Sequence, residues 1–408
     1  VANQLIEKDY LDHDFIANHT EKFEDFKEFV KAYTLERGAE GTGLSKEQIL
    51  ELVEVIHNGK KVSFWWTMGV NQGYEAVRTA QAIINLALMT GNIGKEGTGA
   101  NSITGQCNAM GSRAYSNTAV FYGGGDFTNP VRRARIAEVL GVEDHQLAMK
   151  PTKTYNQIIE GINAGEIKAL WILCTNPRHS WTNNETFASA TKKLERFVVQ
   201  DIYDAIESME DATVYFPVVP GIKKEGTYIN LERRISAMRP VLDRGENEIS
   251  DYEAILGVGK ALGMGDELKG WETPKDCFNL MRECSRNMPC DITGITWEAL
   301  ENSKGIQWPY PAGKEEQNKD DQRRLYSDGN FFTPSKKANF MFEEVRENPL
   351  PCTPEFPMVL NTGRGTVGQW HTQSRTKEVK FVEDVSSKKA YIYMNTKMAE
   401  ENNIKEII

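Results

Sequence analysis

Apolar and polar positions alternate with a helical period at the start of the chain. Short helices are predicted over 4–7 and over 23–33, where charges separate apolar residues spaced three and four apart. Ser45, with Gln48 three residues later, forms a capping box. This signal predicts that a further helix occupies 46–57.

The pattern then changes to a continuous apolar run with β-branched residues over 61–68. Such a run indicates a buried parallel strand. Gly69 opens a polar turn, and a period of 3.6 follows over 76–91, where a glycine ends it. Strand, turn and helix together form the unit from which parallel sheets with helices on both faces are built.

A second unit of this kind follows. A strand is predicted over 167–173, a helix over 184–194 and a second strand over 197–201. A third strand is predicted over 214–219, and Pro217 favours an edge position for it. The spacing fits successive βαβ crossovers.

The remaining pattern is weaker. Residues 265–349 are polar without a clear period, which predicts a long connection packed on the surface. Strands are predicted over 358–361 and 391–394, and a short helix over 396–402. Because the sequence offers few other strands for these to pair with, we expect a truncated C-terminal domain.

Composition limits the class of protein. The chain has 408 residues, 40% hydrophobic and 26% charged, which is typical of a soluble protein with two or three domains. A net charge of -10 argues against nucleic acid as a partner. The most apolar run, 169–174, has only strand length, so no membrane span is expected. Because Val1 is neither an initiator Met nor part of an export signal, we expect the true N-terminus to be missing.

The six cysteines include no C-x-x-C pair, so the sequence gives no support for a zinc ribbon or a local iron–sulfur loop. We interpret Cys277, Cys284 and Cys290 as surface thiols of a helix and loop, since their spacing matches no standard metal pattern. Scattered thiols in a large chain indicate a reducing compartment, which favours a cytoplasmic location.

Candidate chemistry lies where predicted parallel strands end, because ligands bind beyond the carboxyl ends of such strands. The first such segment is 68–73, with glycines and amide side chains. The second is the glycine-rich run 91–106, which suits a loop around a bulky polar ligand but spells no nucleotide fingerprint. Arg113 follows soon after and is a candidate for holding an anion.

The order of several segments resembles one family, the bis-molybdopterin guanine dinucleotide enzymes related to dimethyl sulfoxide reductase. The segments that carry this resemblance are 90–106, 174–177, 199–201, 225–234 and 362–364. Together they span most of the chain in family order.

Within the family, assimilatory and periplasmic-type nitrate reductases are the most similar. The run T-G-Q-C-N-A-M-G-S-R from Thr104 to Arg113 resembles their T-G-Q-P-N-A-M-G-G-R, and 369–375 resembles their Q-W-H-T-x-[ST]-R. Cys107 replaces their Pro, and Ala-Tyr-Ser follows Arg113 where they have Glu-Val-Gly. Formate dehydrogenases usually carry Arg at the position of Thr104, which counts against formate.

The resemblance implies an α/β fold with Rossmann-like doubly wound parallel sheets in two layers, plus the start of a C-terminal β-barrel-like domain. We expect the second half of one Rossmann-like domain in 1–106 and a second one in 107–305. A connecting segment would span 306–354, and the truncated β domain 355–408.

The resemblance also implies a bis-molybdopterin guanine dinucleotide with Mo or W, and a 4Fe-4S cluster in the missing N-terminal region. Nitrate would be the substrate, and ferredoxin or an NAD(P)H-oxidising subunit the electron donor. The residues expected near the metal are Met68, Thr104 and Arg113. Those expected to bind the cofactor are Gly69, Asn71, Gln72, Gly105, Gln106, Asn108, Cys174, Thr175, Asn176, Gln200, Asp201, Thr362, Arg364, Gln369, Trp370, His371 and Arg375.

Alternatives remain open at this stage. Asp201 could accept hydrogen bonds from guanine or cap a following helix. The enzyme could be a formate dehydrogenase, or the chain could be a structural subunit without catalysis. Because the family's metal-ligating Cys or selenocysteine has no counterpart here, we expect the 408 residues alone to be inactive, and we interpret Cys107 and Cys174 as packing or loop thiols.

Overall fold

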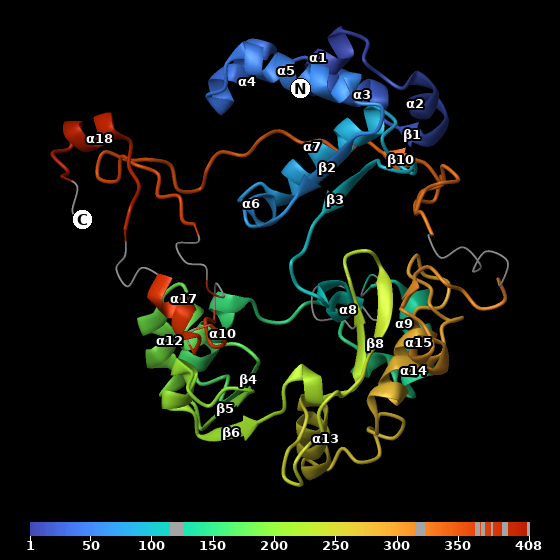
Figure 1. Cartoon of the computed structure of the whole chain (residues 1–408), viewed down its shortest axis with the longest axis vertical. Helices are drawn as coiled ribbons and strands as arrows, with labels where there is room; N and C mark the ends of the chain where they lie inside the picture. The colour runs from blue at the N-terminus through green and yellow to red at the C-terminus, as the bar shows by residue number, and fades with distance from the viewer. Residues whose placement is uncertain are drawn as a thin grey trace. The chain divides into compact units, whose positions relative to one another are not determined.

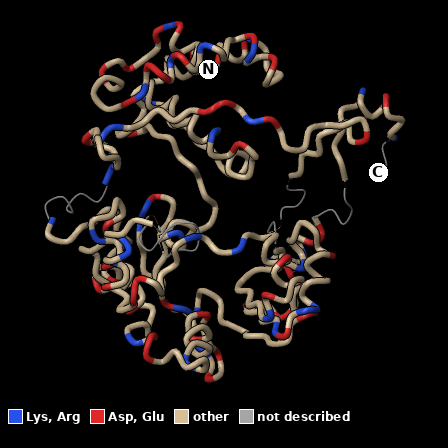
Figure 2. The backbone as a smooth tube through the Cα atoms, turned by 180° about the vertical axis from the view of Figure 1, so that it is seen from behind, with Lys and Arg blue, Asp and Glu red and all other residues tan. Residues whose placement is uncertain are grey.

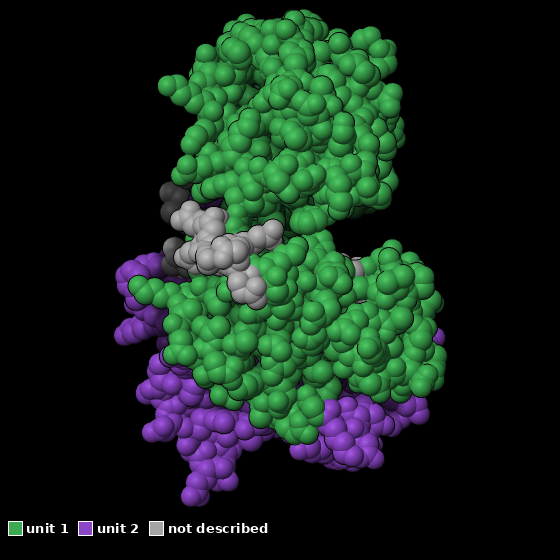
Figure 3. Space-filling view, turned by 90° about the vertical axis from the view of Figure 1, so that its right-hand side faces the viewer, with its two compact units in different colours: residues 1–151, 225–238, 270–355 green, residues 152–224, 239–269, 356–408 purple. Residues whose placement is uncertain are grey.

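The computed structural model describes residues 1–114, 126, 128–314, 323–363, 368, 372–376, 378–385 and 391–405. Its contacts divide the chain into two compact units, which Figure 3 shows in different colours. Unit 1 comprises Val1–Pro151, Glu225–Met238 and Gly270–Glu355. Unit 2 comprises Thr152–Lys224, Arg239–Lys269 and Phe356–Ile408. Each unit therefore combines three separate stretches of sequence, and the domain boundaries expected from the sequence stay predictions.

Helices at the start of unit 1 pack around an apolar core. They are α1 (Ala2–Glu7), α2 (His13–His19), α3 (Phe23–Val30), α4 (Leu35–Thr42) and α5 (Lys46–Asn58). Leu5, Phe26, Val53 and Phe340 are buried in this core. Phe340 follows β10 (Ala338–Asn339), which pairs in parallel with β1 (Thr20–Glu21) and so returns a distant segment to the N-terminal helices. The helices predicted over 4–7 and 46–57, with the capping box, are confirmed, whereas the predicted helix 23–33 ends at Val30.

A parallel strand pair follows these helices. β2 (Ser63–Trp66) pairs with β3 (Gly99–Ser102), and the short α6 (Met68–Asn71) and the longer α7 (Ala76–Met89) connect them. The predicted strand and helix are confirmed, but the prediction that the strand is buried is wrong. Trp65 is 71% exposed, because side chains along a strand alternate between its two faces and Trp65 lies on the more exposed one.

The rest of unit 1 contains an antiparallel sheet and helices. The strands are β7 (Gly226–Ile229), β8 (Arg234–Met238) and β9 (Ile306–Gln307). The helical segments are α8 (Ala109–Ala114), α9 (Pro130–Leu140), η1 (Asp144–Gln146), α14 (Pro274–Cys284) and α15 (Trp297–Glu301). Phe278, Ile295 and Leu300 are buried against the sheet. The prediction of a surface connection over 265–349 is therefore wrong, because a few large apolar side chains among many charges are enough to form a core.

The cysteine cluster is also less exposed than predicted. Cys284 is buried beside Ile136 and Leu147, and Cys277 and Cys290 are half-buried. Burial raises the pKa of Cys284 to about 11. The interpretation of these residues as surface thiols is wrong for Cys284, which behaves as a small apolar side chain.

Unit 2 is built on a parallel sheet. Its strands β4 (Ala169–Leu173), β5 (Arg196–Asp201) and β6 (Val214–Pro217) lie in sequence order, so β6 is at an edge, as Pro217 predicts. The helical segments are α10 (Tyr155–Asn163), α11 (Pro177–Ser180), α12 (Asn184–Thr191), η2 (Glu207–Asp211), η3 (Gly221–Lys223), α13 (Asp251–Ala261), α17 (Lys380–Val385) and α18 (Thr396–Glu401). Figure 1 shows α10 and α12 beside this sheet.

The two faces of this sheet differ. Ile172, Phe197 and Val199 are buried against α10 and α12. Gln200 follows Val199 directly and therefore points to the opposite face of the sheet. Leu173 and Phe216 share that face, because both pair with Gln200 in the register. The predicted crossovers are present, but the second passes through the 3-10 helix η2 instead of an α-helix. The observed class is thus mixed α/β with parallel sheets.

The C-terminal strand predictions are wrong. Residues 358–361 and 391–394 are not in strands, and Val359 and Tyr393 are 76% and 90% exposed. A strand needs a neighbour for its backbone hydrogen bonds, and no described segment pairs with them. Among the described residues no sheet closes into a barrel, whereas the predicted helix is confirmed as α18.

Two further features of the fold are the distribution of its charged residues and the length of its helices. Figure 2 shows Lys and Arg interspersed with Asp and Glu along the backbone instead of gathered in one basic segment. None of the helices in the described ranges has the length and apolar content that a bilayer crossing requires.

Candidate functional site

The carboxyl edge of the unit 2 sheet brings together two of the predicted segments. Cys174 directly follows β4, and its backbone N–H donates to the carbonyl of Gln200 over 2.8 Å. Cys174 has a φ of 55°, a left-handed conformation that turns the chain sharply at the strand end. Asp201 ends β5, so the predicted loop 174–177 and the predicted pair Gln200 and Asp201 share one edge.

Gln200 belongs to a polar cluster that the sequence does not reveal. Its amide Nε2 donates to Asp251 Oδ1 over 2.8 Å, and the Cys174 thiol donates to the same oxygen over 3.4 Å. Lys224 forms an ion pair with the other oxygen of Asp251. Partial withdrawal from solvent and the neighbouring Asp251 raise the pKa of Cys174 to about 12, so this thiol stays protonated and is poorly suited to ligate a metal.

One atom of this cluster lacks a partner. Gln200 is 0% exposed, and its Oε1 accepts no hydrogen bond from any described residue. An unpaired buried acceptor costs about 1–3 kcal/mol, so a donor from a ligand would stabilise this position. The residues at this edge therefore fit a ligand that brings N–H donors.

Asp201 is 6% exposed, and burial raises its pKa. Its Oδ1 accepts from the backbone N–H of Tyr203 over 3.0 Å, which closes a tight local turn. The alternative that Asp201 caps the following helix is wrong, because the next helical segment is η2 and its N-cap is Ile206. The partly uncompensated carboxylate remains suited to a cationic or N–H-rich ligand.

The Asn176 side chain serves the loop itself. It is 0% exposed, and its Oδ1 accepts from the backbone N–H and hydroxyl of Ser208 at 3.1 and 2.9 Å. Its Nδ2 donates to Glu207 and to the carbonyl of Thr372. Asn176 thus fastens the loop after β4 to η2, and Thr175 is half-buried beside it. The bond to Thr372 also brings part of the predicted C-terminal motif to this loop.

A second predicted edge lies in unit 1, at the ends of β2 and β3. The N–H of Ile103 donates to the carbonyl of Trp66 over 2.8 Å, which places Met68 and Thr104 after paired strand ends. Asn71 donates to Ser102 Oγ and accepts from Trp66 Nε1, each over 3.1 Å, and so ties the two ends together.

The other predicted residues of this edge are open to solvent. Gly69, Gln72, Gly105 and Gln106 are exposed, and Cβ atoms at the two glycines would meet nothing within 4 Å. These four positions therefore leave room for a ligand to approach the backbone.

Two glycines of the run 91–106 have another explanation. Gly91 and Gly94 have φ of 61° and 74°. A Cβ would overlap Asp12 at Gly91 and the carbonyl of Tyr326 at Gly94. Internal packing therefore requires these two glycines, and of the run only Gly105 combines exposure with empty space around it.

Helix α8 carries Arg113. Asn108 precedes this helix, and its Oδ1 accepts from the backbone N–H of Ile229 over 3.0 Å, so it joins α8 to β7. Arg113 itself is exposed and forms no hydrogen bond or ion pair with a described residue. Its guanidinium is thus available to an anion.

The family-like segment 225–234 is a structural hairpin. It forms β7, the turn and the start of β8, and Asn230 Oδ1 accepts from the backbone N–H groups of Glu232 and Arg234, both over 3.0 Å. The Arg233 guanidinium lies 5.1 Å from the ring centre of Trp308. These contacts account for the motif without a ligand.

The last predicted residues cannot all be placed. Thr362 and Arg375 are exposed. Arg364, Gln369, Trp370 and His371 lie outside the described residues.

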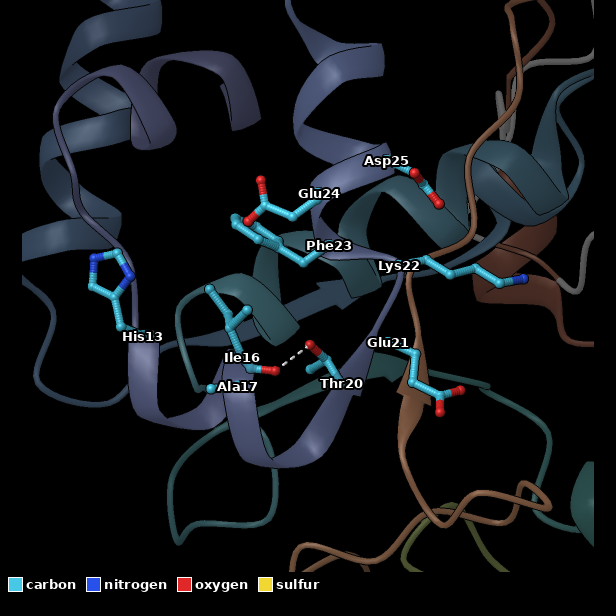
Figure 4. Close-up of a pocket in the computed structure, with 9 residues that line it drawn as sticks. All are labelled: His13, Ile16, Ala17, Thr20, Glu21, Lys22, Phe23, Glu24 and Asp25. Atoms are coloured by element: carbon cyan, nitrogen blue, oxygen red, sulfur yellow. Dashed lines mark hydrogen bonds between the residues drawn. The ribbon is translucent and has the colours of Figure 1, made fainter.

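Two cavities in unit 1 involve other residues. One, of about 540 Å³, is lined by nine residues between His13 and Asp25. Figure 4 shows the Thr20 hydroxyl donating to the Ile16 carbonyl, with Lys22 pointing away from Glu24. The other, of about 450 Å³, is mainly apolar and includes Phe26, Phe29 and Phe342. No predicted site residue is among the described residues that line either cavity.

Comparison with known proteins decides the family. A family model for molybdopterin oxidoreductases matches residues 42–260, more than half of the chain. The chain belongs to the molybdopterin oxidoreductase family. Membership implies a molybdenum or tungsten pterin cofactor, and it confirms the resemblance to the dimethyl sulfoxide reductase family.

Relatives with two different activities match this family member at the same sequence identity. A nitrate reductase of Synechocystis sp. is 30% identical over 95% of this chain and 54% of its own length. The F420-dependent formate dehydrogenase subunit alpha of Methanocaldococcus jannaschii is 30% identical over 95% and 55%. The assimilatory nitrate reductase catalytic subunit of Bacillus subtilis is 30% identical over 88% and 50%. The chain spans about half the length of the curated relatives it matches.

A solved structure supports the fold. Acetylene hydratase from Pelobacter acetylenicus superimposes with a TM-score of 0.56 and 14% sequence identity, over 83% of this chain and 46% of that one. This likeness concerns the architecture alone.

Sequence reasoning missed Lys224, Asp251, Glu207 and Ser208. Ser250 with Glu253 is a capping box that marks the start of α13, but no local signal shows that the first residue of that helix contacts Gln200. The contact depends on the course of the segment before α13, where Ile249 forms a parallel bridge with Val218 after β6.

Proposed function

We propose that this chain is part of a molybdenum enzyme that reduces nitrate to nitrite and holds a bis-molybdopterin guanine dinucleotide. The observation that carries the proposal is the run from Thr104 to Arg113, which begins at the end of a parallel strand pair and finishes with an exposed guanidinium. Its sequence resembles that of nitrate reductases, and two of the relatives described above bear that name.

The residues of unit 2 fit the guanine part of such a cofactor. Guanine presents N–H groups on one edge, and Gln200 Oε1 is a buried acceptor without a described partner at the end of β5. The Asp201 carboxylate ends the same strand as a second acceptor, on the opposite face of the sheet. Gly69 and Gly105 would let the backbone approach phosphate or pterin atoms in unit 1. When bound, the pterin-held metal supplies the redox chemistry.

The protein groups would then bind and orient the substrate. Arg113 can donate two parallel hydrogen bonds to a planar oxyanion, which holds it in a fixed direction. Met68 and Thr104, after paired strand ends, would limit the space around the anion. The chain has a net charge of -10, so this local cation is needed to attract nitrate.

Formate oxidation is the second candidate, because a formate dehydrogenase subunit is as similar in identity and coverage as the nitrate reductases. Thr104 argues against it, since formate dehydrogenases usually carry Arg there. A structural subunit without catalysis is the third candidate.

The test is an assay of the full-length protein with each substrate. With a reduced viologen dye as donor, we expect nitrate to be converted to nitrite; with an oxidised dye as acceptor, we expect no formate oxidation. Formate turnover without nitrate turnover would replace the first candidate by the second. Absence of both activities in a metal-loaded protein would favour the structural subunit.

Other parts of the proposal concern the whole enzyme. We propose a 4Fe-4S cluster outside these 408 residues, electron supply from ferredoxin or an NAD(P)H-oxidising subunit, and a cytoplasmic location. The 408 residues alone should show no turnover, because no cysteine here matches the family's metal ligand. Nitrite production by this chain alone would contradict that expectation.

A further inference from the structure

The amide of Gln200 is held in one orientation by a residue from another element. Asp251 is the first residue of α13, and its Oδ1 lies 2.8 Å from Gln200 Nε2. An ionised carboxylate can only accept hydrogen bonds, so Gln200 must turn its NH₂ group toward Asp251. Its Oε1 is thereby directed away from Asp251.

Lys224 keeps Asp251 in the form that imposes this orientation. Burial opposes the charge on Asp251, but hydrogen bonds from Lys224 and Gln200 outweigh it and hold the pKa of this carboxyl below its ordinary value. The Cys174 thiol donates to the same carboxylate. The cluster therefore satisfies Asp251 and leaves Gln200 Oε1 as a fixed, buried acceptor without a described partner.

A second orphan atom lies on the same face of the sheet. Trp171 precedes Leu173 by two residues, so both side chains share the face on which Gln200 lies. The indole Nε1 of Trp171 is shielded from solvent and donates to no described residue. This face thus offers one acceptor and one donor without partners, which matches a ligand that carries N–H and acceptor groups on one ring system.

We infer that Asp251 and Lys224 are positioning residues that fix Gln200 Oε1 to accept a hydrogen bond from a guanine N–H. This inference rests on the proposed function, because the guanine belongs to the proposed cofactor. Asp251 contacts Gln200, and Lys224 contacts Asp251. Both residues act on the ligand only through the direction of the Gln200 amide.

The experiment uses the full-length protein isolated with its cofactor. The rate at which guanine nucleotide leaves the folded protein during dialysis is measured by acid hydrolysis and chromatography. Asp251→Ala, Lys224→Met and Gln200→Ala should each speed release about tenfold, the effect of losing one hydrogen bond to a buried group. Lys224→Arg keeps the charge and should release at the wild-type rate.

A double variant separates positioning from general support of the fold. If Asp251 acts through Gln200, Asp251→Ala combined with Gln200→Ala should release no faster than Gln200→Ala alone. Asp243→Asn, an exposed carboxylate in the same unit, is the matched control and should change nothing. If Asp251→Ala does not fold, the comparison of Lys224→Met with Lys224→Arg carries the test.

The outcomes distinguish this inference from the proposed function. One outcome would overturn the positioning role and leave the proposed function intact. In it the wild type contains guanine nucleotide, and the release rate of the double variant rises by the product of the two single-variant factors. Wild-type release from Asp251→Ala or Lys224→Met would do the same. A full-length protein that contains metal or pterin but no guanine nucleotide would overturn both.

Discussion

Asp201 illustrates at the scale of one residue how a ligand site can destabilise an empty fold. Burial raises its pKa, so the folded chain holds this proton more tightly than the unfolded chain does. Stability from this group is therefore present at low pH and is lost as pH rises through the range between the unfolded and the folded pKa. Above that range the ionised Asp201 opposes folding.

Asp201→Asn should consequently stabilise the cofactor-free protein at neutral pH, since an amide oxygen can still accept from Tyr203. The urea midpoint at pH 7 should rise, and the difference from wild type should shrink as pH falls toward the ordinary pKa of aspartate. A lower midpoint at pH 7 would mean that the carboxylate has a favourable partner in the fold.

Gly94 provides a second test at this scale. Gly94→Ala places a Cβ against the carbonyl of Tyr326 at a φ of 74°, and we expect a loss of about 1–3 kcal/mol in stability. Gly257→Ala is the matched control, because Gly257 lies within α13 with nothing within 4 Å of a Cβ and should gain about 0.5–1 kcal/mol. Unfolding midpoints by urea measure both, and equal effects would contradict the packing explanation for Gly94.

Arg113 is the residue whose replacement should change activity. Arg113→Ala should lower kcat/KM for nitrate by roughly 10- to 100-fold, the effect of losing a charge-assisted hydrogen bond to the substrate. Arg346→Ala, which removes another exposed guanidinium of unit 1, should leave it unchanged. Steady-state kinetics on the full-length protein decide the matter, and equal kinetics for both variants would remove Arg113 from the site.

At the scale of elements, the sequence predicts what depends on local order. The capping box at Ser45 and the apolar runs of β4 and β5 are local signals, and the corresponding elements are present. The core formed by Phe278, Ile295 and Leu300 could not be predicted, because its members are scattered among charged residues and meet only in the folded unit. Exposure of Trp65 depends on whether other elements cover its face of β2, which the residues of β2 do not specify.

The start of α13 is the element whose integrity the candidate site needs most. Ser250 caps this helix and accepts from the N–H of Glu253 over 3.2 Å, so Ser250→Ala should cost about 1 kcal/mol and loosen the turn that carries Asp251. Ser45→Ala removes an equivalent cap from α5 in unit 1. Both should lower the unfolding midpoint, but only Ser250→Ala should also speed loss of guanine nucleotide. Faster loss in both would point to general loosening of the fold.

At the scale of the whole molecule, the family is firmly supported and the specificity is a proposal. The order of motifs along the chain predicted the family, and the family model confirms it. The site was predicted in part: Cys174, Gln200 and Asp201 share one edge of unit 2, whereas Asp251 and Lys224 reach that edge from distant segments. Such contacts depend on tertiary packing, which no local pattern encodes.

The most direct measurement of the central claim is the composition of the full-length protein as isolated. Metal is determined by mass spectrometry, and guanine nucleotide is released by acid and quantified by chromatography. The account predicts molybdenum or tungsten together with two guanine nucleotides for each metal atom. A protein that contains metal and pterin but no guanine nucleotide, or neither metal nor nucleotide, would contradict it.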